Sequence, residues 1–439
     1  MTAPATSIAI VGTGYVGLTT GACLAKLGHQ VTCADIDADK IDLLNRGEIP
    51  IVEEGLAEVV ASARAAGRLE FVLGAATAAA VADIVFLCVP TPQGDDGSAD
   101  LSYIQAAATE IGPSLRPGSI IVNKSTVPVG STRVVERAVR RDDVHVVSNP
   151  EFLREGTAVR DFLHPDRVVI GAADRDAAER VAALYAALDA EILITDPASA
   201  ETIKYAANGF LAMKISFVNA VAAMCEAVGA DVAAVVQGIG SDTRIGSAFL
   251  NPGPGWGGSC FPKDSRALVR IAQDHGYNFS MMRGVIEVND EQRSRMVDKV
   301  IRALEGHERS VLSGSRVGVL GLTFKAGTDD LRDSPSISVI RDLIRFGADV
   351  TAYDPTVVDP LHPARAAALD GITLCADPYA AATDSDVVVI LTEWPEFKEL
   401  DLGKLATVMA GKTIVDTRNL LDPIEVRSAG LGYDGVGRR

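Results

Sequence analysis

The chain has 439 residues, which is too long for one comfortable hydrophobic core, so the sequence predicts two or three domains. Its hydrophobic content of 48% and charged content of 23% are ordinary for a soluble globular protein, and its net charge of -17 argues against a nucleic acid or an anionic membrane as partner. The six cysteines form no C-x-x-C pair and the six histidines are dispersed, which disfavours a metal site.

The first residues, MTAPATSIAIVGTG, contain no basic segment and no long apolar stretch before a strand pattern begins. We therefore expect a cytoplasmic protein with reduced thiols. No stretch of the chain looks long enough to be a membrane span.

A glycine motif follows the first predicted strand directly. Gly12, Gly14 and Gly17 form G-x-G-x-x-G at the start of a helical pattern, and the next strand ends in Asp35. This context predicts a Rossmann-like dinucleotide site, in which the glycines admit the pyrophosphate and the carboxylate bonds the adenosine ribose. Because an acid at this position repels a 2′-phosphate, NAD is favoured over NADP. A glycine turn without a ligand is the weaker alternative.

Residues 1–196 alternate Ala-rich helical patterns with short apolar runs, namely SIAIVG, HQVTCADID, ADIVFLCVP, GSIIVNKST, VHVVSNP and RVVIGA. This alternation is typical of a doubly wound α/β fold with a parallel sheet. Polar residues stand where two of these strands end. Ser125 and Thr126 lie in NKSTVPVGST, and Glu151 and Glu155 lie in SNPEFLREGTA. In such folds the carboxyl ends of the strands face the ligand, so these residues are candidates for the site.

Residues 197–300 change to a helical pattern, which predicts a long central helix joining two sheets and offering a dimer surface. Lys204 and Asn208 are spaced i, i+4 on one face of this helix, together with Glu201. A solvated lysine is the ordinary interpretation of Lys204, but its apolar neighbours favour a half-buried functional lysine about equally.

One cysteine occupies an unusual place. Cys260 stands between the glycine-rich GPGWGGS and a helix that Pro262 is suited to begin. A helix start and the neighbouring Lys263 favour the thiolate, so Cys260 is interpreted as a nucleophile and the other five cysteines as small buried apolar residues. A nucleophilic thiol beside an NAD site suggests oxidation of an alcohol through a thiohemiacetal and a thioester to a carboxylate.

Residues 301–439 repeat the first pattern in the same order. RVGVLGLTFKAG echoes SIAIVGTGYVGL, RFGADVTAYDP echoes KLGHQVTCADID, and DSDVVVILTEWP echoes VADIVFLCVPTP. The sequence thus predicts a second Rossmann-like domain that has lost the glycine spacing and binds something other than a dinucleotide, such as a nucleotide-linked substrate. Asp354 at its strand end is interpreted first as a plain turn residue.

These segments together resemble one known family. GTGYVGL, KSTVPVG, NPEFLREGTA, ETIKYAANGF, DTRIGSAFLNPGPGWGGSCFPKD and GLTFKAGTDDLRDSP are similar, in order and over nearly the whole chain, to the UDP-glucose branch of the nucleotide-sugar dehydrogenases. The resemblance implies NAD-dependent oxidation of UDP-glucose to UDP-glucuronate by a homodimer, with the C-terminal domain binding the UDP-sugar.

The resemblance also implies roles for individual residues. Catalytic roles fall to Cys260 as nucleophile, to Lys204 and Asp264 in proton transfer, and to Asn208, Thr126 and Glu151. Cofactor contacts are implied for Gly12, Gly14, Tyr15, Val16, Gly17, Asp35, Lys40, Thr91, Thr126, Glu155, Lys263 and Arg332. Substrate contacts are implied for Glu151, Phe152, Leu153, Lys204, Asn208, Arg244, Phe249, Asn251, Gly257 and Lys325, with Arg244 reaching across a dimer.

Three alternatives stay open. The same machinery could oxidise GDP-mannose or another nucleotide sugar, because pocket shape decides base and sugar. A two-electron hydroxyacid dehydrogenase also carries a Lys/Asn helical pair after an NAD domain, but it has no role for Cys260. An NAD-binding sensor or scaffold would need none of Lys204, Asn208, Cys260 and Asp264.

Overall fold

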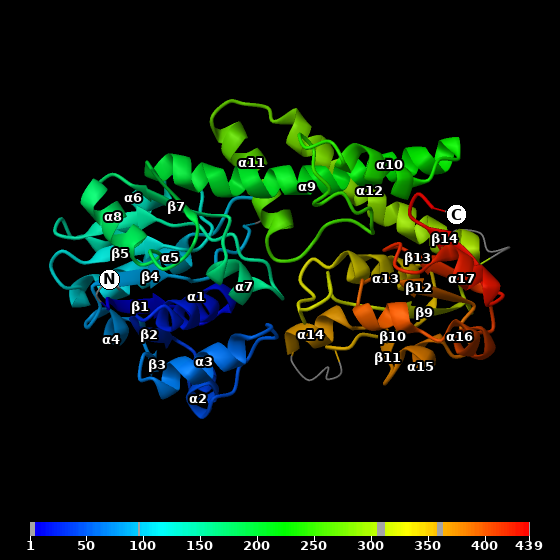
Figure 1. Cartoon of the computed structure of the whole chain (residues 1–439), viewed down its shortest axis with the longest axis horizontal. Helices are drawn as coiled ribbons and strands as arrows, with labels where there is room; N and C mark the ends of the chain where they lie inside the picture. The colour runs from blue at the N-terminus through cyan, green and yellow to red at the C-terminus, as the bar shows by residue number, and fades with distance from the viewer. Residues whose placement is uncertain (1–4, 95–96, 305–311, 358–362, 439) are drawn as a thin grey trace. The chain divides into compact units, whose positions relative to one another are not determined.

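The computed structural model describes residues 5–94, 97–304, 312–357 and 363–438, and the chain divides into two compact units (Figure 1). Unit 1 comprises Met1–Ala207 and Arg266–Gly276, and unit 2 comprises Asn208–Ser265 and Tyr277–Arg439. Two helices, α9 (Pro197–Val228) and α11 (Phe261–Asp274), contribute residues to both units.

Unit 1 contains an eight-stranded sheet in the order β3-β2-β1-β4-β5-β6-β7-β8. Neighbouring strands are parallel, as predicted, except that β6 and β7 are antiparallel. The strands are β1 (Ser7–Val11), β2 (Gln30–Asp35), β3 (Leu69–Leu73), β4 (Ile84–Leu87), β5 (Ile120–Asn123), β6 (His145–Ser148), β7 (Arg167–Ala172) and β8 (Glu191–Thr195). The helices are α1 (Tyr15–Lys26), α2 (Ala38–Arg46), α3 (Leu56–Ala65), α4 (Ala75–Ala79), α5 (Ser102–Ile111), the 3-10 helix η1 (Gly112–Ser114), α6 (Ser131–Val139), α7 (Ala158–Leu163) and α8 (Arg175–Ala183).

Unit 2 contains a six-stranded parallel sheet in the order β11-β10-β9-β12-β13-β14. Its strands are β9 (Arg316–Leu320), β10 (Asp349–Tyr353), β11 (Ile372–Leu374), β12 (Val387–Ile390), β13 (Thr413–Asp416) and β14 (Gly432–Gly435). Its helices are α10 (Val232–Gly240), α12 (Ser280–Ala303), α13 (Pro335–Arg345), α14 (Pro363–Ala368), α15 (Pro378–Ala382), the 3-10 helix η2 (Pro395–Glu399), α16 (Leu402–Val408) and α17 (Pro423–Ser428).

The repeat seen in the sequence is present in the structure. The first six strands of unit 1 and the six strands of unit 2 follow the same spatial order. Gly12 and Gly321 both have φ +96°, and each donates its N–H at 2.8 Å to the second strand of its own sheet, to Ala34 O and Tyr353 O respectively. The turn after the first strand is therefore the same in both units, and its positive φ explains why each unit has glycine there.

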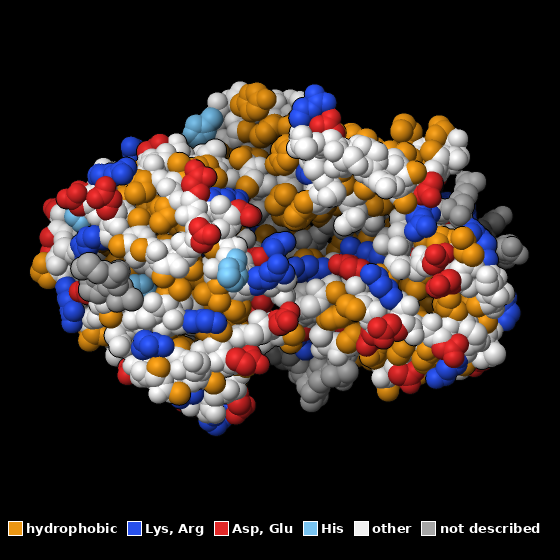
Figure 2. All heavy atoms as spheres, in the orientation of Figure 1, with side chains coloured by type: hydrophobic (Ala, Val, Ile, Leu, Met, Phe, Trp, Pro, Cys, Tyr) orange, Lys and Arg blue, Asp and Glu red, His pale blue; other side chains and the backbone are white. Residues whose placement is uncertain are grey.

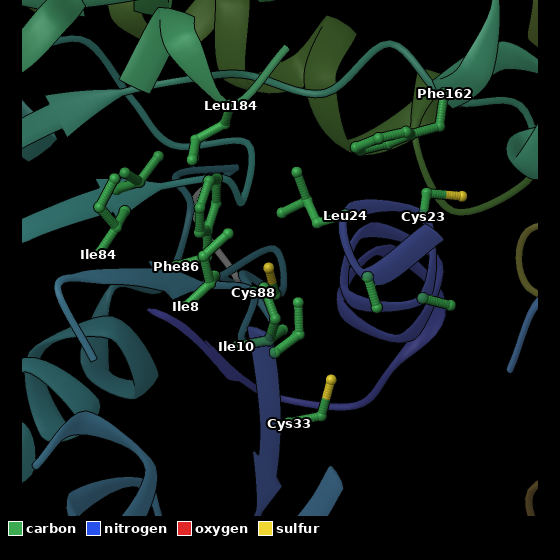
Figure 3. Close-up of a cluster of buried hydrophobic side chains, with 14 of the residues drawn as sticks. Ile8, Ile10, Cys23, Leu24, Cys33, Ile84, Phe86, Cys88, Phe162 and Leu184 are labelled. Atoms are coloured by element: carbon green, nitrogen blue, oxygen red, sulfur yellow. The ribbon is translucent and has the colours of Figure 1, made fainter. Parts of the chain in front are cut away.

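Both faces of the first sheet are buried, because helices cover each of them. Ile8 and Ile10 of β1 pack into one core with α1, α3 and α8, whereas Ala9 of the same strand packs into a second core with α4, α5 and α6. In Figure 3, Ile10 and Phe86 from the strands lie near Leu24 of α1. Alternate residues of one strand serve two cores, which explains why the strands read as continuous apolar runs.

By length and composition, α9 is the one helix among the described residues that could cross a membrane, so the sequence-based expectation that no stretch reaches that length was wrong. A third of its most apolar window is buried in the structure. A single helix of this kind is weak evidence for a membrane span.

Acidic and basic side chains both occur over each unit on the face drawn in Figure 2.

We predict that Gly321→Ala destabilises unit 2 more than Gly314→Ala does. Both glycines have positive φ, so either substitution adds strain of about 1–3 kcal/mol. At Gly321 the new Cβ would also collide with the Thr392 side chain, which adds an overpacking cost of about 1–3 kcal/mol, whereas nothing lies within 4 Å at Gly314. Denaturant unfolding of both variants measures the difference, and equal losses would contradict the assigned crowding.

Candidate functional site

The glycine turn of unit 1 has the geometry of a phosphate cradle. A Cβ on Gly12 would lie 2.6 Å from Cys88 O, and a Cβ on Gly17 would collide with Gly12 O, so both positions exclude side chains. Nothing lies within 4 Å of a Cβ built on Gly14, which is the N-cap residue of α1 and supplies no side-chain cap. The start of this twelve-residue helix thus presents backbone N–H groups to an anion, and the cradle fits a dinucleotide pyrophosphate.

Asp35 ends β2 beside this cradle. Its Oδ2 accepts hydrogen bonds from Thr13 N (2.8 Å), Thr13 Oγ1 (2.6 Å) and Lys40 Nζ (3.0 Å), and its Oδ1 accepts from Asp37 N (3.1 Å). Burial raises the pKa of this carboxyl, but the hydrogen bonds from Thr13, Lys40 and Asp37 outweigh it and lower the pKa to about 2. The carboxylate is therefore ionised at neutral pH and is held in one orientation.

The other candidate cofactor residues of unit 1 lie on loops at the carboxyl ends of its strands. Thr91 Oγ1 donates to Thr126 O at 2.9 Å, which ties the loop after β4 to the loop after β5. Gly156 N donates to Tyr15 Oη and to Glu53 Oε2, each at 2.7 Å, so the loop that carries Glu155 is fixed to α1. Val16 is partly buried against the first core.

A buried ion pair is the strongest polar interaction in this region. Lys204 Nζ lies 2.9 Å from Glu151 Oε1, and the two side chains are 4% and 5% exposed. Glu151 Oε2 also accepts from Leu153 N at 2.6 Å, and the Phe152 ring centroid lies 5.3 Å from Lys204 Nζ. Burial raises the pKa of Glu151, but Lys204 and its hydrogen bonds outweigh this and leave the pKa below its ordinary value. Lys204 is thus fully buried, beyond the half-burial expected from its neighbours.

A second buried lysine, Lys124, lies in this cluster and was not among the candidates predicted from the sequence. Lys124 Nζ donates to Asn149 Oδ1 at 3.1 Å, and the same oxygen accepts from Tyr185 Oη at 2.6 Å. Burial lowers the pKa of Lys124 to about 8, while the nearby Glu151 opposes that shift. A signal was present in NKST, where a lysine directly follows the strand Ile120–Asn123, whose first three residues are apolar.

In unit 2, the thiol lies at a helix start. Helix α11 begins at Phe261, so Cys260 directly precedes it, and Asp264 N donates to Cys260 O at 2.9 Å. Asp264 is fully buried. Its Oδ2 accepts from Asn208 Nδ2 at 2.6 Å and its Oδ1 accepts from Lys263 Nζ at 2.8 Å. Cys260 is partly exposed, and its Sγ lies 3.6 Å from Ser259 Oγ. An accessible thiol and a buried carboxylate are therefore neighbours on one helical turn.

The glycines before Cys260 are needed by the protein itself. A Cβ on Gly257 would collide with Asp333 O, and a Cβ on Gly258, which has φ +80°, would lie 2.8 Å from the Phe324 ring. These two glycines therefore leave room for the 324–335 loop of the protein itself.

Helix side chains hold the backbone of the same glycine loop. Gly253 N donates to Asn219 Oδ1 at 2.8 Å, and Gln292 Nε2 donates to Gly253 O at 2.7 Å. Asn289 bonds both the N–H and the C=O of Trp256, at 2.8 and 3.0 Å. The loop is thereby fixed to α9 and α12.

The remaining candidate residues of unit 2 make separate contacts and do not form one cluster. Arg244 is 87% exposed and pairs with Asp242, whereas Arg332 pairs with Asp330. Phe249 has φ +63° and its ring packs at 6.3 Å from that of Phe261. Asn251 is exposed, and Lys325 Nζ lies 5.7 Å from the Phe324 ring.

Arg418 was not assigned from the sequence, but the structure directs it to the strand ends of unit 2. It donates to Leu391 O and Phe324 O, each at 2.8 Å, and lies 3.1 Å from Glu393. Asp354 is 2% exposed and accepts from Leu322 N and Trp394 Nε1, in agreement with its interpretation as a turn residue.

The candidates thus fall into two groups. Lys204, Thr126 and Glu151 belong to unit 1, whereas Cys260, Asp264 and Asn208 belong to unit 2. Lys204 and Asn208 are one turn apart on α9, which passes from one unit to the other between them. Cys375 is partly exposed, which corrects the expectation that every cysteine other than Cys260 is buried, because edge strand β11 leaves it uncovered. No group of three or more His, Cys, Asp or Glu suited to a metal occurs in the part of the chain that the structure describes.

Comparisons with known proteins give a consistent result. Family models of the UDP-glucose/GDP-mannose dehydrogenases match in order: the NAD binding domain over residues 6–189, the central domain over 198–291 and the UDP binding domain over 318–423. A UDP-glucose 6-dehydrogenase of Rhizobium meliloti (strain 1021) is 48% identical over 98% of this chain and 99% of its own, and one of Bacillus subtilis (strain 168) is 45% identical over 98% and 93%.

A solved structure agrees with the sequence comparisons. A UDP-glucose dehydrogenase of Pyrobaculum islandicum superposes with a TM-score of 0.89 at 38% identity, covering 99% of this chain and 98% of that one. The chain therefore belongs to the UDP-glucose/GDP-mannose dehydrogenase family and is an NAD-dependent dehydrogenase.

Proposed function

We propose that this enzyme oxidises UDP-glucose to UDP-glucuronate with two NAD, through a covalent intermediate on Cys260. The observation that carries the proposal is the accessible Cys260 thiol at the start of α11, one turn before the buried Asp264 that Asn208 holds at 2.6 Å. A dehydrogenase that stops at a carbonyl has no use for this thiol. The relatives named above carry the UDP-glucose 6-dehydrogenase activity in their names.

NAD supplies the hydride acceptor, and the residues of unit 1 fit it. Gly12, Gly14 and Gly17, with Tyr15 and Val16 at the helix start, would hold the pyrophosphate, and Asp35 would bond the adenosine ribose. Further contacts are assigned to Lys40, Thr91, Thr126, Glu155, Lys263 and Arg332. In this structure Lys263 bonds Asp264 and Arg332 bonds Asp330, so these two contacts depend most on the family resemblance.

The chemistry balances over two oxidations at one carbon. The C6 hydroxyl loses its proton to a protein base while C6 loses a hydride, which leaves an aldehyde. Cys260 Sγ then bonds to C6, and loss of a second hydride and the hydroxyl proton gives a thioester. Water breaks the C6–Sγ bond, so one UDP-glucose, two NAD and one water yield UDP-glucuronate, two NADH and three protons.

Protein groups move these protons and stabilise the charged oxygens. Lys204, ion-paired with Glu151, is assigned to proton transfer at the C6 oxygen, and Asp264, held by Asn208, to the hydrolytic water. Thr126 and Asn208 donate hydrogen bonds to that water or to the developing oxyanion. The pKa of Glu151, below its ordinary value, keeps the counterion of Lys204 charged.

The contacts to the UDP-sugar are assigned residue by residue from the family resemblance. Its contacts are taken as Glu151, Phe152, Leu153, Lys204, Asn208, Arg244, Phe249, Asn251, Gly257 and Lys325. The family includes enzymes for GDP-mannose, so another nucleotide sugar is the second candidate. The UDP binding domain model over residues 318–423 favours uracil.

The chain organisation we propose is an NAD-binding domain at residues 1–196, a central helical dimerisation region at 197–300 and a UDP-sugar-binding domain at 301–439. We place the enzyme in the cytoplasm, away from nucleic acids and membranes, in keeping with the reduced thiols expected from the sequence and with a net charge of -17.

The dimer interface we propose is the exposed apolar face of α9. Apolar side chains that are exposed or partly exposed recur there at alternating spacings of three and four residues: Ile203, Ala206, Phe210, Met213, Phe217, Ala220, Met224 and Ala227. Phe210, Phe217 and Met224 are more than half exposed in the single chain. A repeat of this period is the seam of a helix pair, so a second copy of α9 is its proposed occupant.

We predict that wild-type enzyme forms two NADH per UDP-glucose, whereas Cys260→Ser stalls after little or no turnover because the serine hydroxyl is a far weaker nucleophile at neutral pH. Absorbance of NADH against sugar consumed gives the ratio, with Cys375→Ser as the control at the other partly exposed cysteine. One NADH per sugar, or an undisturbed Cys260 variant, would exclude the covalent route. Turnover of GDP-mannose in place of UDP-glucose would support the second candidate.

We predict that Asp35→Ala raises KM for NAD and narrows the preference for NAD over NADP, because the carboxylate that bonds the ribose and repels a 2′-phosphate is lost. Loss of a hydrogen bond to a charged group corresponds to roughly a tenfold change. Steady-state kinetics with each cofactor measures the ratio of kcat/KM. Asp39→Ala, in the first turn of α2, is the control, and an unchanged ratio in Asp35→Ala would remove Asp35 from the cofactor site.

We predict that Phe217→Glu dissociates the dimer at concentrations where the wild type is paired, because a charge would be buried in the apolar seam. Analytical ultracentrifugation reports the mass of each species. Val81→Glu, at another exposed apolar residue (52%), is the matched control and should leave the assembly unchanged. A dimeric Phe217 variant would place the interface elsewhere.

A further inference from the structure

Glu201 is a buried carboxylate on α9 that the proposed mechanism does not use. It lies three residues before Lys204 and is 2% exposed. Its Oε2 accepts from Gly130 N at 2.6 Å, and its Oε1 accepts from Thr132 N at 3.0 Å and from Thr132 Oγ1 at 2.8 Å. All these residues belong to unit 1. Three donors thus converge on one carboxylate that comes from a segment about seventy residues away in the chain.

The acceptor fills a need of α6. This helix starts at Ser131, and its N-cap residue is Gly130, which has φ +94° and no side chain to accept a hydrogen bond from the first turn. An N-cap is normally satisfied by a local Ser, Thr, Asp or Asn. Here Glu201 replaces the local cap, so the start of α6 can keep its N–H groups satisfied only where α9 holds it.

The other end of the same segment is tied to the sheet. Ser125 Oγ donates to Val89 O at 2.7 Å, and Thr91 Oγ1 donates to Thr126 O at 2.9 Å. Between Thr126 and Gly130 lie only Val127, Pro128 and Val129. One proline and two β-branched residues leave this segment little conformational freedom. The position of Thr126 is therefore determined from both ends.

We propose that Glu201 is a positioning residue for the reaction. It lies about one helical turn before Lys204 on α9 and binds Gly130 and Thr132, so it fixes the Thr126 segment to the helix that carries Lys204. The inference rests on the proposed function, in which Thr126 and Lys204 act on the same substrate and cofactor. It differs from a purely structural cap because Glu201 would act through Thr126.

A double-mutant cycle separates the two roles. Glu201→Gln keeps the shape but places an amide against donors, and we expect roughly a tenfold loss of kcat in the otherwise wild-type enzyme, the size of one lost charged hydrogen bond. In the Thr126→Ala background the same substitution should cost less than about twofold, since the positioned group is already absent.

Glu110→Gln is the matched control, because Glu110 also accepts from two backbone N–H groups at a helix start, those of Ala75 and Ala76. It should leave kcat unchanged in both backgrounds. Equal losses from Glu201→Gln with and without Thr126, or a Glu201 variant as silent as Glu110→Gln, would overturn the proposal.

Two further measurements keep the outcome decisive. Thr132→Val removes only the hydroxyl contact and should lower kcat in the same direction by less, so it replaces Glu201→Gln if that variant does not fold. If the wild type does not oxidise UDP-glucose, the proposed function fails, but the cycle can still be measured on the NAD dissociation constant, because Thr126 is also placed against the cofactor. If the effects of Glu201→Gln and Thr126→Ala on that dissociation constant simply add, the positioning role is overturned, whatever the substrate of the enzyme is.

Discussion

The structure depends on the two faces of one helix. Along α9, the buried face carries polar side chains, and each must find a partner because an unpaired buried polar group is costly. Those side chains are Glu201, Lys204, Asn208, Ser216 and Asn219. Their partners are a helix start, a carboxylate, a second carboxylate, a tryptophan N–H and a loop N–H. The same element thereby orders the candidate residues of both units, while its opposite face stays apolar.

Two loops that carry candidate residues are held by side chains from distant segments of the chain. Glu53 and Tyr15 hold the loop of Glu155, and Asn289 and Gln292 hold the loop before Cys260. Each contact joins segments that are far apart in the chain, so the loops are ordered only when the helices around them have packed. This arrangement gives rigid positions to groups on segments that have no regular hydrogen bonding.

Much of the fold could be predicted because buried parallel strands read as apolar runs. The runs at β1, β2, β4, β5, β6 and β7 were identified, as were the long helix and the repeat. Strands β3 and β8 were missed because they are the edges of the sheet, and their alternate side chains are exposed. In the site, residue types and spacing indicated Lys204, Asn208 and Glu151 as candidates, and the family resemblance added Asp264. The pairs Lys204–Glu151 and Asn208–Asp264 were not predicted, since pairing across 53 and 56 residues depends on packing. Lys124 and Arg418 escaped for the same reason.

The matching acids at the two strand ends have one more consequence. Asp35 and Asp354 occupy equivalent turns, but the second bonds Leu322 N, Thr323 N, Trp394 Nε1 and Thr356, all within its own unit. The acid that we propose to bond a ribose in unit 1 therefore has an equivalent in unit 2 that stabilises the fold of its own turn. Restoring glycine at Thr323 and Ala326 would therefore not recover a second dinucleotide site, because Asp354 would first have to be released from the hydrogen bonds it now makes.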